Sequence, residues 1–206
     1  LLTMPVSVST LVWGKFLASW IFAAAALVLT FPFWLTVNYL GAPDNGVIAG
    51  SYLGSWVLAG CMLAISQTMS ALTKNQVIAL VLAVIVNFLF FLSGVEYVLG
   101  FFRMFAPAAV VDMVASFSFL VHFGTIAGGL LEMRDVVFFV SVILLFNVTT
   151  ILVVSFRTSG TSRWLKSTQA AYYVLFFLLL LTAFTGLNLT ANRFLRTEQY
   201  DFTQEK

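Results

Sequence analysis

Residues Phe16 to Leu40 form an apolar stretch without a charged side chain, and this feature constrains the fold more than any other. At a rise of 1.5 Å per residue, a helix over this stretch is long enough to cross a hydrocarbon core of roughly 30 Å. The rest of the chain has the same character, with 61% hydrophobic residues, 9% charged residues and a mean hydropathy of +1.03. A soluble domain has roughly a quarter of its residues charged. The sequence therefore predicts an all-α polytopic membrane protein.

Apolar runs separated by polar turns give the expected spans. We predict five transmembrane helices, at about 16–40, 47–72, 76–98, 136–156 and 169–191. Pro32 is expected to kink the first helix near its far side, because proline removes a backbone donor. The turns at 41–46 and 73–76 are too short to hold a domain. Asn38, Asn87, Asn147 and Asn188 are read either as lining a path or, more commonly for membrane helices, as bonding to a neighbouring helix.

Residues 99–134 remain apolar but contain Arg103, Pro107, Asp112, His122 and several glycines. This pattern predicts a re-entrant hairpin before the fourth helix, made of two short helices broken near Pro107 and again around Gly124. Irregular backbone at membrane depth must be buried in protein or line a water-filled cavity. We therefore expect an outer lid in which Asp112 and His122 meet water, each other or a neighbouring copy. The alternative is that either residue has a structural role only.

Small residues recur at four-residue spacing at the start of the second span. Gly46, Gly50 and Gly54 lie on one helix face, with Ser51 and Ser55 beside them. Small side chains let helix backbones approach closely in a membrane. This face is expected to pack against protein.

The first residues predict a helix start at the water boundary. Pro5, Ser7, Ser9 and Thr10 are typical of a helix N-terminus, and Trp13 with Lys15 is typical of the cytoplasmic interface. With that orientation, the inner loops contain Lys15, Lys74, Arg157, Arg163 and Lys166. The outer segments contain Arg103, Arg134, Arg193, Arg196 and Lys206, together with all the acidic residues: Asp44, Glu96, Asp112, Glu132, Asp135, Glu198, Asp201 and Glu205. The basic residues divide evenly, so the acidic asymmetry decides the orientation.

The order LLT-x-P-V-S followed by G-K-F-L-A resembles the cytoplasmic segment between the second and third membrane helices of ABC transporter type-2 permeases, in their gliding-motility-associated and copper-maturation-associated branch. The resemblance implies a coupling segment at 1–15 that contacts a separate ATP-binding subunit. Its contact residues would be Leu1, Leu2, Met4, Pro5, Val6 and Ser7, with Gly14 and Lys15 as the turn into the bilayer. The family also places short re-entrant helices before its last span. Since two membrane helices precede this segment in the family, we expect the sequence to be a piece of a longer permease.

The end of the chain has a second resemblance. An apolar helix ending in L-N-L-x-A-N-R-F-x-R and followed by Y-D-F-T-x-E-K is similar to the membrane anchor of the gliding-motility-associated auxiliary protein, which leads into an external domain. This implies a fusion of a permease part at 1–156 and an anchor at 169–206. Residues 157–168, which include Ser159, Gly160, Thr161 and Ser162, would be a cytoplasmic linker.

The sequence lacks the motifs that nucleotide binding and metal binding commonly require. The sequence has no Gly-x-x-x-x-Gly-Lys-Ser/Thr loop, one histidine and one cysteine, Cys61. We therefore expect no enzymatic activity, no metal and no cofactor in this chain, with ATP and magnesium bound by the partner. Basic residues are too sparse for nucleic acid.

These observations lead to one principal hypothesis and two alternatives. The principal one is a multi-pass permease subunit in a bacterial plasma membrane, surrounded by lipid, that couples ATP hydrolysis in a partner to export or to mechanical transduction. A second permease copy, or a related permease, would face it through the first and third spans. The alternatives are a non-transporting anchor or scaffold for an external domain and, with less support, a secondary transporter, which would need internal repeats and intramembrane charges. The apolar spans permit a lipid-like or polypeptide cargo and equally permit none.

Overall fold

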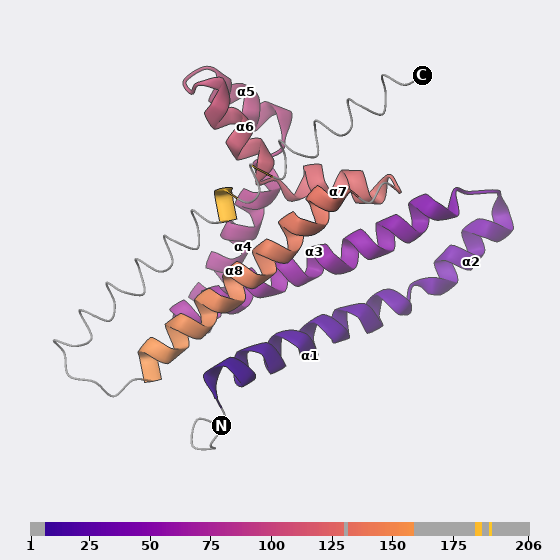
Figure 1. Cartoon of the computed structure of the whole chain (residues 1–206). Coiled ribbons are helices and arrows are strands. Elements are labelled where there is room, and N and C mark those ends of the chain that lie inside the picture. Colours follow the sequence, from indigo (N-terminus) through magenta and orange to yellow (C-terminus); the bar gives the residue numbers. More distant parts are fainter. Residues whose placement is uncertain (1–6, 130–131, 159–183, 187–189, 191–206) are drawn as a thin grey trace.

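The computed structural model describes residues 7–129, 132–158, 184–186 and 190 (Figure 1). The described residues are helical and contain no strand. The helices are α1 (Val8–Val28), α2 (Phe31–Leu40), α3 (Asn45–Leu72), α4 (Gln76–Leu92), α5 (Glu96–Arg103), α6 (Ala108–Ser116), α7 (Phe119–Ala127) and α8 (Met133–Thr158). The all-α prediction is confirmed for this part of the chain. The predicted linker, the fifth span and the C-terminal anchor lie almost entirely outside the described residues.

Three stretches are long and apolar enough to cross a membrane: Val8–Leu40, Asn45–Leu72 and Met133–Thr158. The count rises to as many as five if each of two bent helix pairs, α4 with α5 and the α6 region with α7, is one span. A multi-pass membrane protein is therefore supported by length and composition. The first of these spans starts eight residues earlier than the predicted start at Phe16, because α1 begins directly after its cap at Ser7.

The first span is broken where proline requires it. α1 ends at Val28, Leu29 and Thr30 form a turn, and Pro32 occupies the first turn of α2. A proline has no N–H to donate to the preceding turn, so the regular helical ladder is interrupted just before it. The predicted kink is thus present at Leu29 and Thr30.

The helix α3 is the centre of the packing and contacts α1, α4, α7 and α8 (Figure 1). Its buried residues Cys61, Ala64 and Ile65 face a core that also contains Phe16 of α1. The remaining core is mostly aromatic and aliphatic residues of α7 and α8: Phe119, Ile126, Phe138, Phe139, Val142, Ile143 and Leu145. The small residues on α3 allow these larger side chains to approach its backbone.

Polar ties join α1 and the turn that follows it to α3 at three places. The amide of Gln67 donates to the carbonyl of Val12 at 3.1 Å. Trp20 and Trp56 stack and exchange hydrogen bonds, and the hydroxyl of Tyr52 donates to the carbonyl of Thr30 at 3.0 Å. A carbonyl oxygen has two lone pairs, so these bonds add to the helical ladder and do not replace it. The ties are distributed along almost the whole of α1.

The region between α4 and α8 differs from the prediction in two details. α4 ends at Leu92 and not at Val98, since α5 leaves it at an angle of 77° after a turn at 93–95. α7 runs through Gly124 without a break, and the expected break there is wrong. The chain bends instead at Phe117 and Ser118, where the Ser118 hydroxyl accepts from the backbone N–H groups of Leu120 and Val121 and so begins α7. The predicted break at Pro107 is present between α5 and α6.

Candidate functional site

The strongest cluster of polar side chains lies where α6, α7 and α8 meet. His122 of α7 and Asp135 in the first turn of α8 are 2% and 0% exposed, and Nδ1 of the histidine lies 2.6 Å from Oδ1 of the aspartate. The other ring nitrogen, Nε2, lies 3.0 Å from the carbonyl oxygen of Ser116 at the end of α6. One imidazole ring therefore connects three helices.

Aromatic rings enclose this pair. The imidazole stacks on Phe138 with a centroid distance of 4.0 Å and an interplanar angle of 19°, and Phe139 meets it edge-on at 6.2 Å. Phe119, one turn before His122, is completely buried against both phenylalanines. The rings keep water from the pair on this side, and a polar contact is stronger electrostatically where water is excluded.

Two further charged residues at the start of α8 adjoin the pair. The guanidinium of Arg134 lies 3.1 Å from Oε2 of Glu132, and its Nε lies 3.6 Å from Oδ1 of Asp135. Among the described residues, Asp135 Oδ2 and Arg134 Nε are buried without a hydrogen-bond partner. The carboxylate of Asp135 is thus only partly satisfied by the protein. Such a buried polar atom costs free energy unless another group reaches it.

The two predicted lid residues are not brought together. Asp112 is exposed on α6, whereas His122 is buried on α7 and bonded to Asp135. The sequence indicates Asp135 only as one of the outer acids, because the pairing depends on how α7 packs against α8. The available signal was an acidic residue in the first turn of an apolar span, thirteen positions after the single histidine.

The predicted coupling segment is described only from Ser7 onward; Leu1, Leu2, Met4, Pro5 and Val6 lie outside the described residues. Ser7 caps α1 by accepting from the N–H of Thr10 at 3.2 Å. Gly14 and Lys15 are exposed, and the turn expected at them is absent because α1 is continuous from Val8 to Val28. An isolated glycine costs a helix only about 1 kcal/mol, which apolar packing on either side can offset.

Three basic residues, Lys15, Lys74 and Arg157, lie at one end of the described bundle, whereas Arg103 and Arg134 lie at the other end. Arg157 donates to the carbonyls of Leu72 and Thr73, at 2.6 and 3.4 Å, and so joins the end of α8 to the end of α3. Lys74 follows in the α3–α4 turn, and the tie from Gln67 to Val12 holds the start of α1, with Lys15, beside the last turns of α3. No acidic residue lies at this end within the described ranges. The acidic residues Asp44, Glu96, Asp112, Glu132 and Asp135 lie at the other end.

The predicted glycine face of α3 lies against α7. A Cβ on Gly50 would come closer than 3.0 Å to the carbonyl oxygen of Ile126, and one on Gly54 would lie 3.2 Å from the Ile126 side chain. A Cβ on Gly46 would lie 3.1 Å from Oδ1 of Asp44, the residue that caps α3. Gly129, with a φ of 82°, ends the α7 region and lies against the backbone of Gly46 and Val47. Glycine is favoured at such a left-handed position.

Two of the intramembrane asparagines are buried. The amide of Asn87 donates to the carbonyl of Ala83 at 2.8 Å and contacts Ser66 of α3 at 3.4 Å, and that of Asn147 donates to Ile143 at 2.9 Å. Their side-chain oxygens have no hydrogen-bond partner among the described residues. Asn38 is exposed and bonds to Asn45 across the α2–α3 turn, while Asn188 lies outside the described residues.

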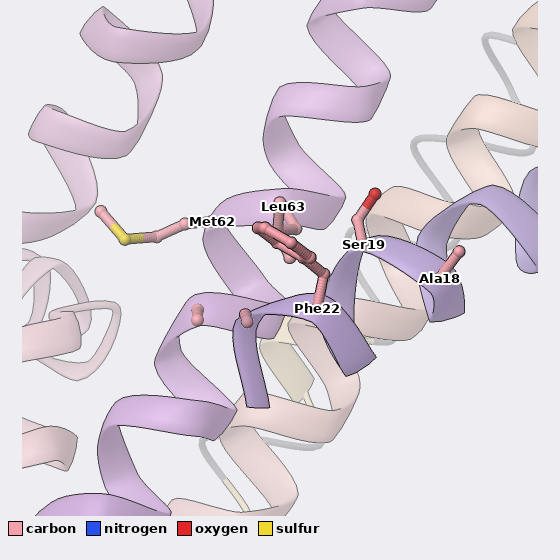
Figure 2. A pocket seen from close by; sticks show the side chains of 7 residues that line it. Ala18, Ser19, Phe22, Met62 and Leu63 are labelled. Carbon is pink, nitrogen blue, oxygen red and sulfur yellow. The ribbon is translucent and has the colours of Figure 1, made fainter. Parts of the chain in front are cut away.

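A shallow groove of about 710 Å³ runs between α1 and α3. Figure 2 shows Ser19 and Phe22 contributed by α1 and Met62 and Leu63 by α3. The hydroxyl of Ser19 is already used, because it donates to the Lys15 carbonyl at 3.0 Å. The groove therefore offers little hydrogen bonding and does not resemble a site for a polar ligand.

Comparison of the chain with protein-family models, curated proteins and solved structures gave no match.

Proposed function

We propose that this chain is the membrane-spanning subunit of an ABC-type permease, which couples ATP hydrolysis in a separate cytoplasmic subunit to export or to mechanical transduction. The observation that carries the proposal is the presence of three short helices, α5 to α7, between α4 and the membrane-length α8, at the end opposite Lys15, Lys74 and Arg157. Their position before α8 matches the short re-entrant helices implied by the type-2 permease resemblance.

The charge distribution supports the orientation that this function needs. Lys15, Lys74 and Arg157 lie together at one end with no acidic residue beside them in the described ranges, and basic residues near the ends of spans favour the cytoplasmic side. Arg103 and Arg134 lie at the other end together with the acidic residues, so the acidic asymmetry decides the orientation. The chain's start would then face an ATPase subunit, and α5 to α7 would lie at the outer surface of a bacterial plasma membrane. This placement of the first residues is what coupling to a cytoplasmic partner requires.

Two features of α1 would allow it to transmit motion. The helix is uninterrupted from its cap to the break at Leu29 and Thr30, and it is tied to α3 through Val12 and Trp20. A rigid element of this kind can carry a displacement from the cytoplasmic surface into the bundle. The coupling contacts themselves would be made by Leu1, Leu2 and Met4.

Co-purification and ATPase assays test the proposal. The chain, extracted in mild detergent from its native membrane, should bring an ATPase subunit with it and stimulate that subunit's hydrolysis. Replacing Leu2 and Met4 by Asp should abolish stimulation but preserve insertion, because charge would be buried at the contact while no span is changed. Ala42→Asp, an exposed change at the opposite end, is the matched control and should leave stimulation intact.

Two results would overturn the proposal. One is a chain that never co-purifies with an ATPase subunit, and the other is wild-type stimulation by the Leu2→Asp/Met4→Asp variant. An anchor or scaffold would co-purify with an external domain but show no ATP-dependent activity after reconstitution. A secondary transporter would move its substrate along an ion gradient without ATP.

Assembly forms part of the same proposal. The spans present here do not enclose a pathway alone, so two copies, or this chain and a related permease, would face each other through the first span and α4. Both elements carry large exposed apolar residues, including Phe22 at 77% and Val77 at 68%. Cross-linking in native membranes should trap a pair, and detection of monomers alone would count against it.

A further inference from the structure

We propose that His122 and Asp135 bind one shared proton and that this proton latches α7 to α8. Both residues are ionisable, both are buried, and neither is needed for the coupling argument above. The inference does not depend on a partner ATPase, since it follows from the hydrogen-bond geometry of the chain itself.

The partners of the ring fix the number of protons. A carbonyl oxygen can only accept, so the contact of 3.0 Å to Ser116 assigns a hydrogen to Nε2. The contact of 2.6 Å between Nδ1 and Asp135 Oδ1 needs one hydrogen more. That hydrogen comes either from an imidazolium facing a carboxylate or from a carboxylic acid facing a neutral ring. In both descriptions the pair holds one proton in addition to the one on Nε2.

If the pair loses this proton, the ring can no longer make both of its hydrogen bonds. With Nε2 still protonated, the Nδ1 lone pair would face a carboxylate at hydrogen-bond distance. If the remaining hydrogen moved to Nδ1, the lone pair of Nε2 would face the Ser116 carbonyl, and the connection to α6 would be lost. Either arrangement leaves buried polar atoms opposed or unpaired, which is costly. Deprotonation should therefore separate α7 from α6 or from α8.

The neighbouring groups act on the same proton. From α8, Arg134 lies 3.6 Å from Asp135 Oδ1 and is itself paired with Glu132. α3 and α4, which also pack against α7, contain no Asp, Glu, Lys, Arg or His; the titratable groups of α3 are Tyr52 and Cys61, and Cys61 contacts the Phe139 carbonyl. On α6, the charged residue is Asp112, which is exposed. The latch therefore responds chiefly to its own proton and to the Arg134–Glu132 pair.

The direction of the pH response follows from proton linkage. The latched form binds the shared proton, so an open form that has released it is favoured as the pH rises. The hinge at Phe117 and Ser118 lies between the Ser116 carbonyl and the ring that binds it. Raising the pH should therefore increase exposure of the α6–α7 segment.

Nitrogen NMR on the full chain in lipid bilayers tests the proton directly. His122 is the single histidine in the sequence, so ¹⁵N-histidine labelling reports one ring only. The expected result at neutral pH is a hydrogen on Nε2 together with a hydrogen-bonded proton at Nδ1, either attached to it or shared with the carboxyl group. A neutral ring with its hydrogen on Nδ1 and a bare Nε2 would overturn the proposal.

Labelling tests the latch independently. A cysteine placed at Ala115 should react faster with a membrane-impermeant thiol reagent as the pH rises. Thiols themselves react faster at higher pH, so the rate is divided by that of an Asn45→Cys control. Asp135→Asn should label at a rate that no longer depends on pH, because the amide N–H can donate to Nδ1 without a titrating proton. Asp112→Asn, the same change at an exposed acid of α6, should keep the wild-type response. An Asp135→Asn variant that also keeps this response would refute the latch, and the NMR result on the unaltered ring applies even if this variant fails to fold.

Discussion

Trp20 and Trp56 bind each other reciprocally across the α1–α3 interface. Their rings stack at a centroid distance of 4.5 Å and an interplanar angle of 13°. Each indole N–H donates to the backbone carbonyl of the other residue, at 2.9 Å from Trp20 and 3.4 Å from Trp56. Both hydrogen bonds and the stacked surface are lost if either backbone moves away.

The first prediction concerns this pair. Trp20→Phe and Trp56→Phe should each lower the free energy of unfolding in detergent by about 1 kcal/mol, through loss of one hydrogen bond and part of the stacked area. The double variant should depart from additivity, because the two residues share one contact. Trp34→Phe is the control, since its N–H bonds to the exposed side chain of Asn45 and its loss should cost less. Additive single effects would contradict the reciprocal contact.

The second prediction separates a packed glycine from an unpacked one. Gly50→Ala should destabilise the fold by about 1–3 kcal/mol, because the added methyl would press on the backbone carbonyl of Ile126. Gly14→Ala should be neutral or stabilising by up to about 1 kcal/mol, since nothing lies within 4 Å of the added atom. Thermal unfolding of both variants in detergent measures the difference. Equal effects would show that α3 and α7 do not meet at Gly50.

The third prediction concerns orientation. A cysteine at Asn45 should react with a membrane-impermeant reagent added outside intact cells, and one at Lys74 should react only after the membrane is opened. The native Cys61 is buried and should give a low background. The reverse pattern would place the basic end outside and remove the basis for a cytoplasmic partner at the first residues.

The fourth prediction tests the expected outer lid at 99–134. Cysteines at Ala115 and Gly128 should label slowly in resting membranes compared with one at Asn45. Gly128 is exposed in the single chain, so slow labelling there requires cover from the bilayer or from a second copy. Fast labelling at both positions would show an open, solvated segment and remove the lid from the mechanism.

The fifth prediction tests the polar contact between α3 and α8. The hydroxyls of Thr68 and Thr150 lie 2.9 Å apart, and Thr68 is 1% exposed. Thr68→Val should cost about 1 kcal/mol, measured by unfolding in detergent. Thr149→Val, which removes a bond to its own helix only, is the matched control and should cost less. A larger cost for the control would place the polar contact elsewhere.

Several helix boundaries could be predicted from the residues next to them. Ser7, Asp44 and Asn75 each accept from a backbone N–H at the start of a helix, as short polar side chains at such positions commonly do. The break before Pro32 follows from its missing N–H in the same way. These features depend on residues within one turn of each other, so the sequence contains all the information they require.

The small-residue face of α3 could be predicted from its spacing, but other features that depend on packing could not. Gly124 was expected to break a helix, but nothing crowds it and the cap at Ser118 sets the boundary. The partner of His122 was not predicted, because the approach of Asp135 depends on how α7 lies on α3 and α8. Glycine permits a break without requiring one, and a lone histidine does not specify its partner.

The ties from α1 and its following turn to α3 limit how these two helices can move. A slide of α1 along α3 by one helical turn, about 5.4 Å, would take Val12, Trp20 and Thr30 out of reach of Gln67, Trp56 and Tyr52 at the same time. Swinging the two helices together as one body breaks none of these bonds. Sliding of α1 along α3 is therefore excluded while the ties hold, and any displacement of α1 must take α3 with it.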